Sequence, residues 1–203
     1  MLLSALFSRC LRIPYTHLQD GLDYAVCHTA EGTELYLEPS NGALDWLRNL
    51  DFPAAAYCRE GRAAFYAHRG FLRAHNTLIP ILDSLISAPA ARPLTLVGYS
   101  HGAALALLAY EYVGYHRPDL PLSGVGFGCP RVLFGLQRKE MQARLAGFLR
   151  VRNVDDIVTH LPPAALGYYH VGKEVTVGAR GRYSRTDAHR PENILCELLR
   201  AGI

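Results

Sequence analysis

The chain has 203 residues, of which 50% are hydrophobic and only 19% are charged, so it holds enough apolar material for one sizeable core and is not disordered. No linker or repeat divides it, and we expect a single domain over residues 1–203. The formal net charge is only +3, and the positive residues are scattered rather than gathered in a stripe with aromatic residues. We therefore expect no nucleic-acid partner.

The cysteines and the N-terminus bear on the cellular compartment. An odd number of cysteines, five, at wide and irregular spacing predicts reduced packing residues without a metal site, and it favours a cytoplasmic location. The apolar start is interrupted at Arg9 and Arg12, too soon for a secretory signal. No apolar run approaches the roughly 18 residues that a membrane span requires. We expect no transmembrane segment, although export without a cleaved signal is compatible with the same sequence.

The first half of the chain predicts one strand and two helices. Residues 33–38 alternate between apolar and polar side chains, as a strand does, whereas residues 43–50 switch to helical spacing. A longer helical pattern covers residues 70–87, and we expect Pro80 to kink it.

The second half alternates strands with helices. Apolar runs predict strands at residues 94–98, 123–128 and 148–151, and an alternating pattern predicts another at residues 171–177. Helical patterns lie between them and after them, at residues 100–115, 136–145 and 191–199. This alternation predicts an α/β fold with a mostly parallel central sheet that helices cover on both faces.

A sharp turn joins the 94–98 strand to the following helix. Residues 98–102 read Gly-Tyr-Ser-His-Gly and fit the pattern Gly-x-Ser-x-Gly. Such a turn has no room for side chains at its flanking positions, so glycine is required there, and Ser100 is held at the top of the sheet. A hydroxyl at a helix N-terminus also sits where a developing negative charge is stabilised. The context favours Ser100 as a nucleophile over a chance match in which Ser100 only caps the helix.

Further motifs identify the chain, over residues 33–195, as similar to the class 3 lipases, a branch of the α/β hydrolases. Besides the turn at Ser100, they are His-Arg-Gly-Phe at 68–71, Phe-Gly-Cys-Pro-Arg-Val at 127–132, Arg-Asn-Val-Asp-Asp-Ile-Val-Thr-His-Leu-Pro-Pro at 152–163 and Tyr-His-Val-Gly at 169–172. The resemblance implies the α/β-hydrolase fold and the hydrolysis of carboxylic esters by a Ser-His-Asp triad.

A serine hydroxyl needs a base to accept its proton, and the base needs a carboxylate to orient it. In α/β hydrolases these residues follow the serine in the order Asp, then His. The family motif places the carboxylate at Asp156, with Asp155 as the alternative. It places the base at His189, in a polar loop before the last helix. The other histidines after the turn at Ser100 are His116, His160 and His170.

The tetrahedral intermediate of ester hydrolysis also needs donors for its oxyanion. One donor should be the N–H of His101, which follows the nucleophile. The resemblance implies Ser40 as the second donor, although Glu38-Pro39 stands where the family has Arg-Gly. Leu44, Trp46 and Leu47 then belong to a lid helix over the acyl site; an ordinary amphipathic surface helix is the alternative.

We therefore expect a hydrolase that uses neither cofactor nor metal, acts on a small-molecule or lipid ester, and meets a lipid interface transiently. Acylglycerol is the first substrate expected, and phospholipid or feruloyl-type esters are the alternatives. A non-catalytic lipid-binding domain on a decayed hydrolase scaffold is a different class of function, and a serine peptidase or thioesterase is a third.

Overall fold

The computed structural model describes residues 2–17, 22–38, 53–87 and 92–203. The α-helices are α1 (Leu3–Cys10), α3 (Arg69–Ile86), α4 (His101–His116), α5 (Arg138–Arg144) and α6 (Pro191–Ala201), and short 3-10 helices are η1 (Val158–His160), η2 (Ala164–Leu166) and η3 (Asp187–His189). The strands are β1 (Thr16–His17), β2 (Asp23–His28), β3 (Thr33–Leu37), β4 (Ala54–Arg59), β5 (Arg62–His68), β6 (Leu94–Tyr99), β7 (Leu122–Phe127), β8 (Leu133–Phe134), β9 (Phe148–Asn153), β10 (Tyr168–Tyr169) and β11 (Lys173–Val177).

The main sheet has the strand order β1-β2-β3-β6-β7-β9-β11. All neighbours from β3 to β11 are parallel. At the other edge, β1 pairs antiparallel with β2, and β2 pairs antiparallel with β3. The central strands β3 and β6 are almost entirely buried, and most of their side chains are apolar. The predicted mostly parallel sheet is confirmed.

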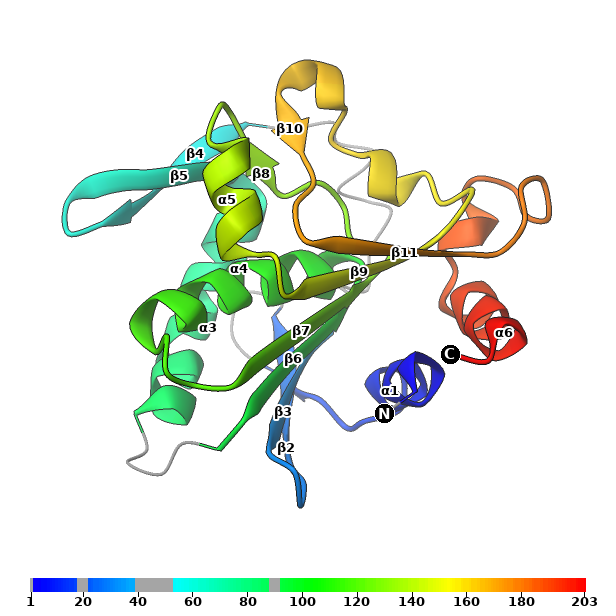
Figure 1. Ribbon diagram of the computed structural model, residues 1–203, viewed down its shortest axis with the longest axis horizontal. Helices are drawn as coiled ribbons and strands as arrows, with labels where there is room; N and C mark the ends of the chain where they lie inside the picture. The colour runs from blue at the N-terminus through cyan, green and yellow to red at the C-terminus, as the bar shows by residue number, and fades with distance from the viewer. Residues whose placement is uncertain (1, 18–21, 39–52, 88–91) are drawn as a thin grey trace.

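Helices cover this sheet on both faces, as the alternation of elements predicts. Figure 1 shows α1 and α6 side by side on one face, close to the two chain termini, and α3 with α4 on the other. Each face has its own apolar cluster. Helix α4 lies between the sheet and α3, and most of its residues are therefore buried.

A second sheet, with the strand order β10-β8-β5-β4, was not predicted. Its longest strands, β4 and β5, contain many alanines, which are uncommon in strands, so their sequence gives little signal. Glu60 and Gly61 join them with φ of 49° and 75°, the left-handed values of a tight hairpin turn. Helix α1 was also missed, because its apolar residues were weighed only as a possible targeting segment.

Two further expectations concern the cysteines and the membrane. All five cysteines are free, but Cys58 is exposed, so the expectation that every cysteine packs in the core is wrong for this one. None of the helices that the structure describes is long and apolar enough to cross a membrane.

Candidate active site

Ser100 lies at the point where β6 ends and α4 begins. Its backbone has φ of 55° and ψ of −116°, a conformation that residues other than glycine rarely adopt. The surroundings hold it there: the Ser100 N–H donates to the carbonyl of Phe127 at 2.8 Å, and the Ser100 carbonyl accepts from Ala103 at 3.1 Å. The neighbouring strand and the first turn of the helix therefore hold Ser100 in this strained conformation.

The two glycines of the turn allow close backbone contacts. A Cβ atom on Gly98 would lie 2.1 Å from the carbonyl oxygen of Gly102. A Cβ atom on Gly102 would lie 2.1 Å from the carbonyl oxygen of Leu37, at the end of β3. These distances confirm that the turn has no room for side chains at either flanking position.

The structure brings Ser100, His189 and Asp156 into one chain of hydrogen bonds. The Ser100 Oγ lies 2.9 Å from the His189 Nε2, and the His189 Nδ1 lies 2.8 Å from the Asp156 Oδ2. All three residues are buried, with exposed fractions of 0% for Ser100 and Asp156 and 4% for His189. The imidazole thus stands between a hydroxyl and a carboxylate, each within hydrogen-bond distance.

The carboxylate follows β9, at the carboxyl end of the sheet. The Asp156 Oδ1 accepts from the N–H of Val158 at 2.8 Å, so both carboxylate oxygens have a donor. Asp155, the alternative, lies elsewhere: its Oδ2 accepts from the N–H of Gly181 at 2.6 Å. Only Asp156 therefore reaches the imidazole.

The base candidate lies in η3, directly before α6. The other three histidines that follow the turn at Ser100 have different surroundings. The side chain of His170 donates through Nε2 to the carbonyl of Thr159, His116 packs against Tyr112 and Tyr115 at the end of α4, and His160 is exposed. Of the four, His189 is the one that the fold brings to Ser100.

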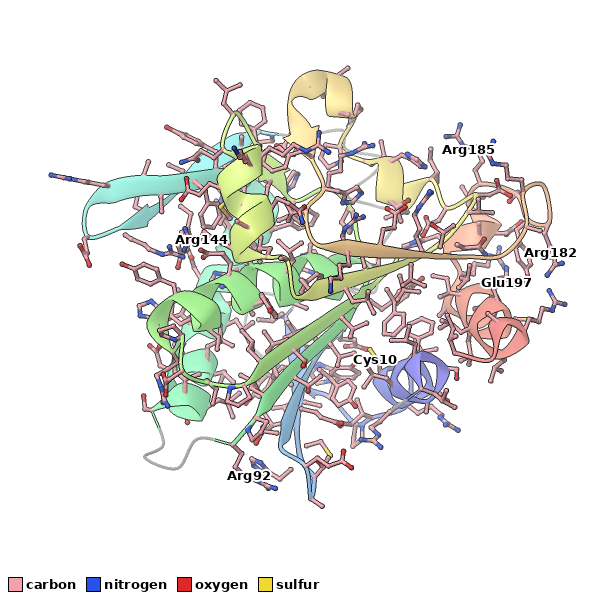
Figure 2. All side chains as sticks on the ribbon, viewed as in Figure 1. Cys10, Arg92, Arg144, Arg182, Arg185 and Glu197 are labelled. Carbon is pink, nitrogen blue, oxygen red and sulfur yellow. The ribbon has the colours of Figure 1, made fainter. Side chains whose placement is uncertain are left out.

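A buried carboxylate with two exposed arginines anchors the loop that carries His189. The Glu197 carboxylate on α6 accepts from Arg182 at 2.9 Å, from Tyr183 at 3.0 Å and from Arg200 at 2.5 Å. Figure 2 shows Arg182 and Glu197 at this position beside α6. The loop is also tied to the segment after Asp156, because the N–H of Ile157 donates to the carbonyl of Arg185 at 3.1 Å. The carboxylate and the imidazole are thus held in one unit.

Two contacts of the imidazole were not predicted from the sequence. The ring of Tyr99 stacks on that of His189 with centroids 5.2 Å apart, and its hydroxyl donates to the His189 carbonyl at 2.6 Å. Gly128 has a φ of 58°, and a Cβ atom there would lie 2.8 Å from the His189 Cε1. Both residues belong to motifs that the sequence showed, but only the three-dimensional contact reveals what they touch.

Of the two expected oxyanion donors, His101 lies among the described residues and Ser40 does not. His101 is the first residue of α4, where backbone N–H groups lack intrahelical partners. Burial, with the nearby His68, lowers the pKa of the His101 side chain to about 4, so this ring is uncharged at neutral pH. Ser40 and the expected lid residues Leu44, Trp46 and Leu47 lie outside the described residues.

The arrangement can perform nucleophilic chemistry. A hydroxyl hydrogen-bonded to an imidazole can transfer its proton as it attacks, and a carboxylate on the far ring nitrogen stabilises the imidazolium that forms. Among the residues that the structure describes, no group of three or more His, Cys, Asp or Glu side chains could hold a metal ion.

The chain is similar to several curated proteins, of which two illustrate the range. Phospholipase A1-II 6 from Oryza sativa subsp. japonica is 31% identical over 169 residues, which cover 66% of this chain and 41% of that protein. A lipase from Rhizomucor miehei is 29% identical over 143 residues, covering 66% of this chain and 39% of that protein. This chain thus spans about two fifths of the length of these relatives.

A solved structure described as a triacylglycerol lipase, whose catalytic centre is a serine protease triad, matches with a TM-score of 0.69. The match is 24% identical and covers 82% of this chain and 66% of that one. It establishes the α/β-hydrolase fold. The family model described as "Lipase (class 3)" matches residues 35–166, well over half of the sequence. The chain therefore belongs to the class 3 lipase family.

Proposed function

We propose that the chain is a serine carboxylic-ester hydrolase that cleaves acyl esters of lipids through an acyl-enzyme on Ser100. The observation that carries the proposal is the chain of hydrogen bonds from the Ser100 hydroxyl through His189 to Asp156, at 2.9 and 2.8 Å. Family membership supports the same class of reaction, because the two relatives bear the names phospholipase A1 and lipase.

Acylation begins with proton transfer from Ser100 to His189. The Oγ attacks the ester carbonyl carbon while its proton passes to Nε2, and the imidazolium then returns that proton to the leaving alcohol. Asp156 accepts the Nδ1–H, which fixes the tautomer that leaves Nε2 free to act as the base. Water, activated by the same imidazole, then releases the acyl group and restores Ser100.

The negative charge on the carbonyl oxygen is stabilised at the N-terminus of α4. We propose the His101 N–H as one donor, supported by its place at the first residue of α4, where the positive end of the helix dipole adds to it. We propose Ser40 as the second donor, on the strength of its place in the family motif.

Acylglycerol is the substrate that we propose first and phospholipid the second, with a transient lipid interface as partner. A feruloyl-type ester is a further alternative. The intact triad geometry argues against a non-catalytic lipid-binding domain, since a decayed scaffold has no need to keep three buried polar groups aligned.

The test is a panel of p-nitrophenyl esters, a triacylglycerol and a diacyl phospholipid, run beside labelling with a fluorophosphonate probe. We expect ester turnover and probe attachment at Ser100 alone, located by peptide mass spectrometry. The preferred lipid decides between acylglycerol and phospholipid. No turnover of any ester together with an unlabelled Ser100 would instead favour the lipid-binding domain.

A further prediction concerns Gly128, because the lack of a side chain there leaves room for the imidazole of His189. In Gly128→Ala, the new Cβ would lie 2.8 Å from the His189 Cε1, so the ring must move. A displacement of this size is expected to lower kcat/KM about 10²-fold. The positive φ of 58° adds a backbone cost of about 1–2 kcal/mol, measurable as a lower melting temperature.

Gly61→Ala is the matched control for this substitution. Gly61 has a φ of 75° and no heavy atom within 4 Å of the position of a Cβ. An alanine there would therefore strain the backbone without clashing with a neighbour. We expect a similar loss of stability with full activity. Equal activity in the two variants would show that the contact with His189 does not position the base.

A further inference from the structure

A polar cavity of about 380 Å³ lies away from the proposed active site, among α5, β9, β10 and the start of β11. Figure 1 shows these elements together on the side of the sheet where α5 lies. Three arginines, Arg131, Arg138 and Arg150, line this cavity, which we name the arginine pocket, together with Tyr169 and His170. None of Ser100, Asp156 and His189 lines it.

The charge in the arginine pocket is not balanced by its acidic residue. Glu174 lines the pocket, but it already pairs with Arg150 at 3.1 Å and with Arg152 at 3.0 Å. Arg138 is exposed at the rim of the pocket and forms no hydrogen bond or ion pair with the residues that the structure describes. Burial lowers the pKa of Arg131, and the positive charges of Arg150 and Arg138 lower it further. The arginines therefore repel one another across the pocket.

The hydroxyl of Tyr169 is a second, independent sign of a missing ligand. The residue is only 7% exposed, and its hydroxyl has no hydrogen-bond partner among the described residues. Burial and the charge of Glu140 raise the pKa of Tyr169 to about 12, and the charge of Arg138 lowers it. A buried hydroxyl without a partner is costly, so a ligand that brought an acceptor to it would be stabilised.

The remaining groups also fit an acceptor rather than a cation. The His170 Nε2 donates to the carbonyl of Thr159, and burial with the charge of Arg150 lowers its pKa to about 3, so the ring is neutral. The Gln142 Oε1 accepts from the N–H of Gly172, which leaves the amide N–H groups of this side chain as its donors. Guanidinium groups match the spacing of oxygens on phosphate and bind it through paired hydrogen bonds.

We propose that the arginine pocket binds a phosphate group, with Arg138 and the Tyr169 hydroxyl as donors that are otherwise without partners. The phosphate belongs either to a small free molecule or to the head group of a lipid. The site is separate from the ester-hydrolysing centre, and the proposal does not depend on the function of Ser100.

Calorimetric titration with inorganic phosphate, at constant ionic strength set with chloride, tests whether the pocket binds a free phosphate. We expect saturable binding that Arg138→Gln weakens about ten-fold, since it removes a charged donor. Tyr169→Phe should weaken binding several-fold without loss of stability, because the hydroxyl has no partner in the free protein. Arg73→Gln, at an exposed arginine of α3, is the matched control and should bind phosphate like the original chain.

Co-sedimentation with lipid vesicles tests whether the pocket binds the head group of a lipid. The vesicles are phosphatidylcholine with ether-linked phosphatidic acid, which an esterase cannot cleave. Retention that is lost in Arg138→Gln and kept in Arg73→Gln would assign the pocket to a lipid head group. Binding of neither probe would overturn the proposal. So would equal losses in Arg138→Gln and Arg73→Gln, which would mean that only the overall charge matters.

Discussion

Replacing Ser100 by alanine is expected to lower kcat/KM for ester hydrolysis about 10⁶-fold, the scale on which serine hydrolases depend on their nucleophile. The change removes the one hydroxyl that lies within 2.9 Å of the His189 Nε2 and leaves the turn otherwise intact. His189→Ala should be equally damaging, because the hydroxyl is a poor nucleophile without its base. The double variant should be no worse than either single one, since the two residues act as a unit.

The measurement is kcat/KM on a p-nitrophenyl ester, with circular dichroism and thermal unfolding to show that each variant folds. His160→Ala is the control, because this histidine is exposed and its ring lies outside the hydrogen-bond chain. It should keep its activity. A Ser100→Ala protein that folds and still hydrolyses the ester at the original rate would remove the basis for the proposed function.

The turn at Ser100 was predictable because its constraints are local. Gly98 and Gly102 are needed for backbone contacts that form within a few residues of the strand and helix that flank them. The largely apolar sequences of β6 and β7 likewise reflect burial on both faces of a parallel sheet. In these places the local pattern and the overall fold agree.

Contacts between distant segments could not be predicted in the same way. Tyr99 meets His189 across 90 residues of sequence, and nothing in the local pattern of Tyr99 indicates that its hydroxyl will reach that carbonyl. Strands β8 and β10 have only two residues each, too short to show an alternation. The arginine pocket likewise combines residues from several elements that are well separated in the sequence. These features depend on the tertiary arrangement rather than on propensity.

Asp156→Asn is expected to lower kcat/KM about 10⁴-fold. The N–H of Val158 needs an acceptor, and in the variant the amide oxygen is the only one that residue 156 can offer it. The amide nitrogen then faces the His189 Nδ1 and donates to it. The neutral imidazole must therefore carry its proton on Nε2, the atom that has to accept the proton of Ser100, and it can no longer act as the base.

Asp155→Asn is the matched control, one residue earlier and with the same chemical change. Asp155 accepts a hydrogen bond from the N–H of Gly181, and an amide oxygen can do the same. The variant should therefore keep its activity within about two-fold, the size of an ordinary surface change. Thermal unfolding of both proteins separates loss of fold from loss of rate. If Asp155→Asn proved to be the inactive one, the carboxylate of the triad would have to be moved by one position, and the orientation of His189 would need a different explanation.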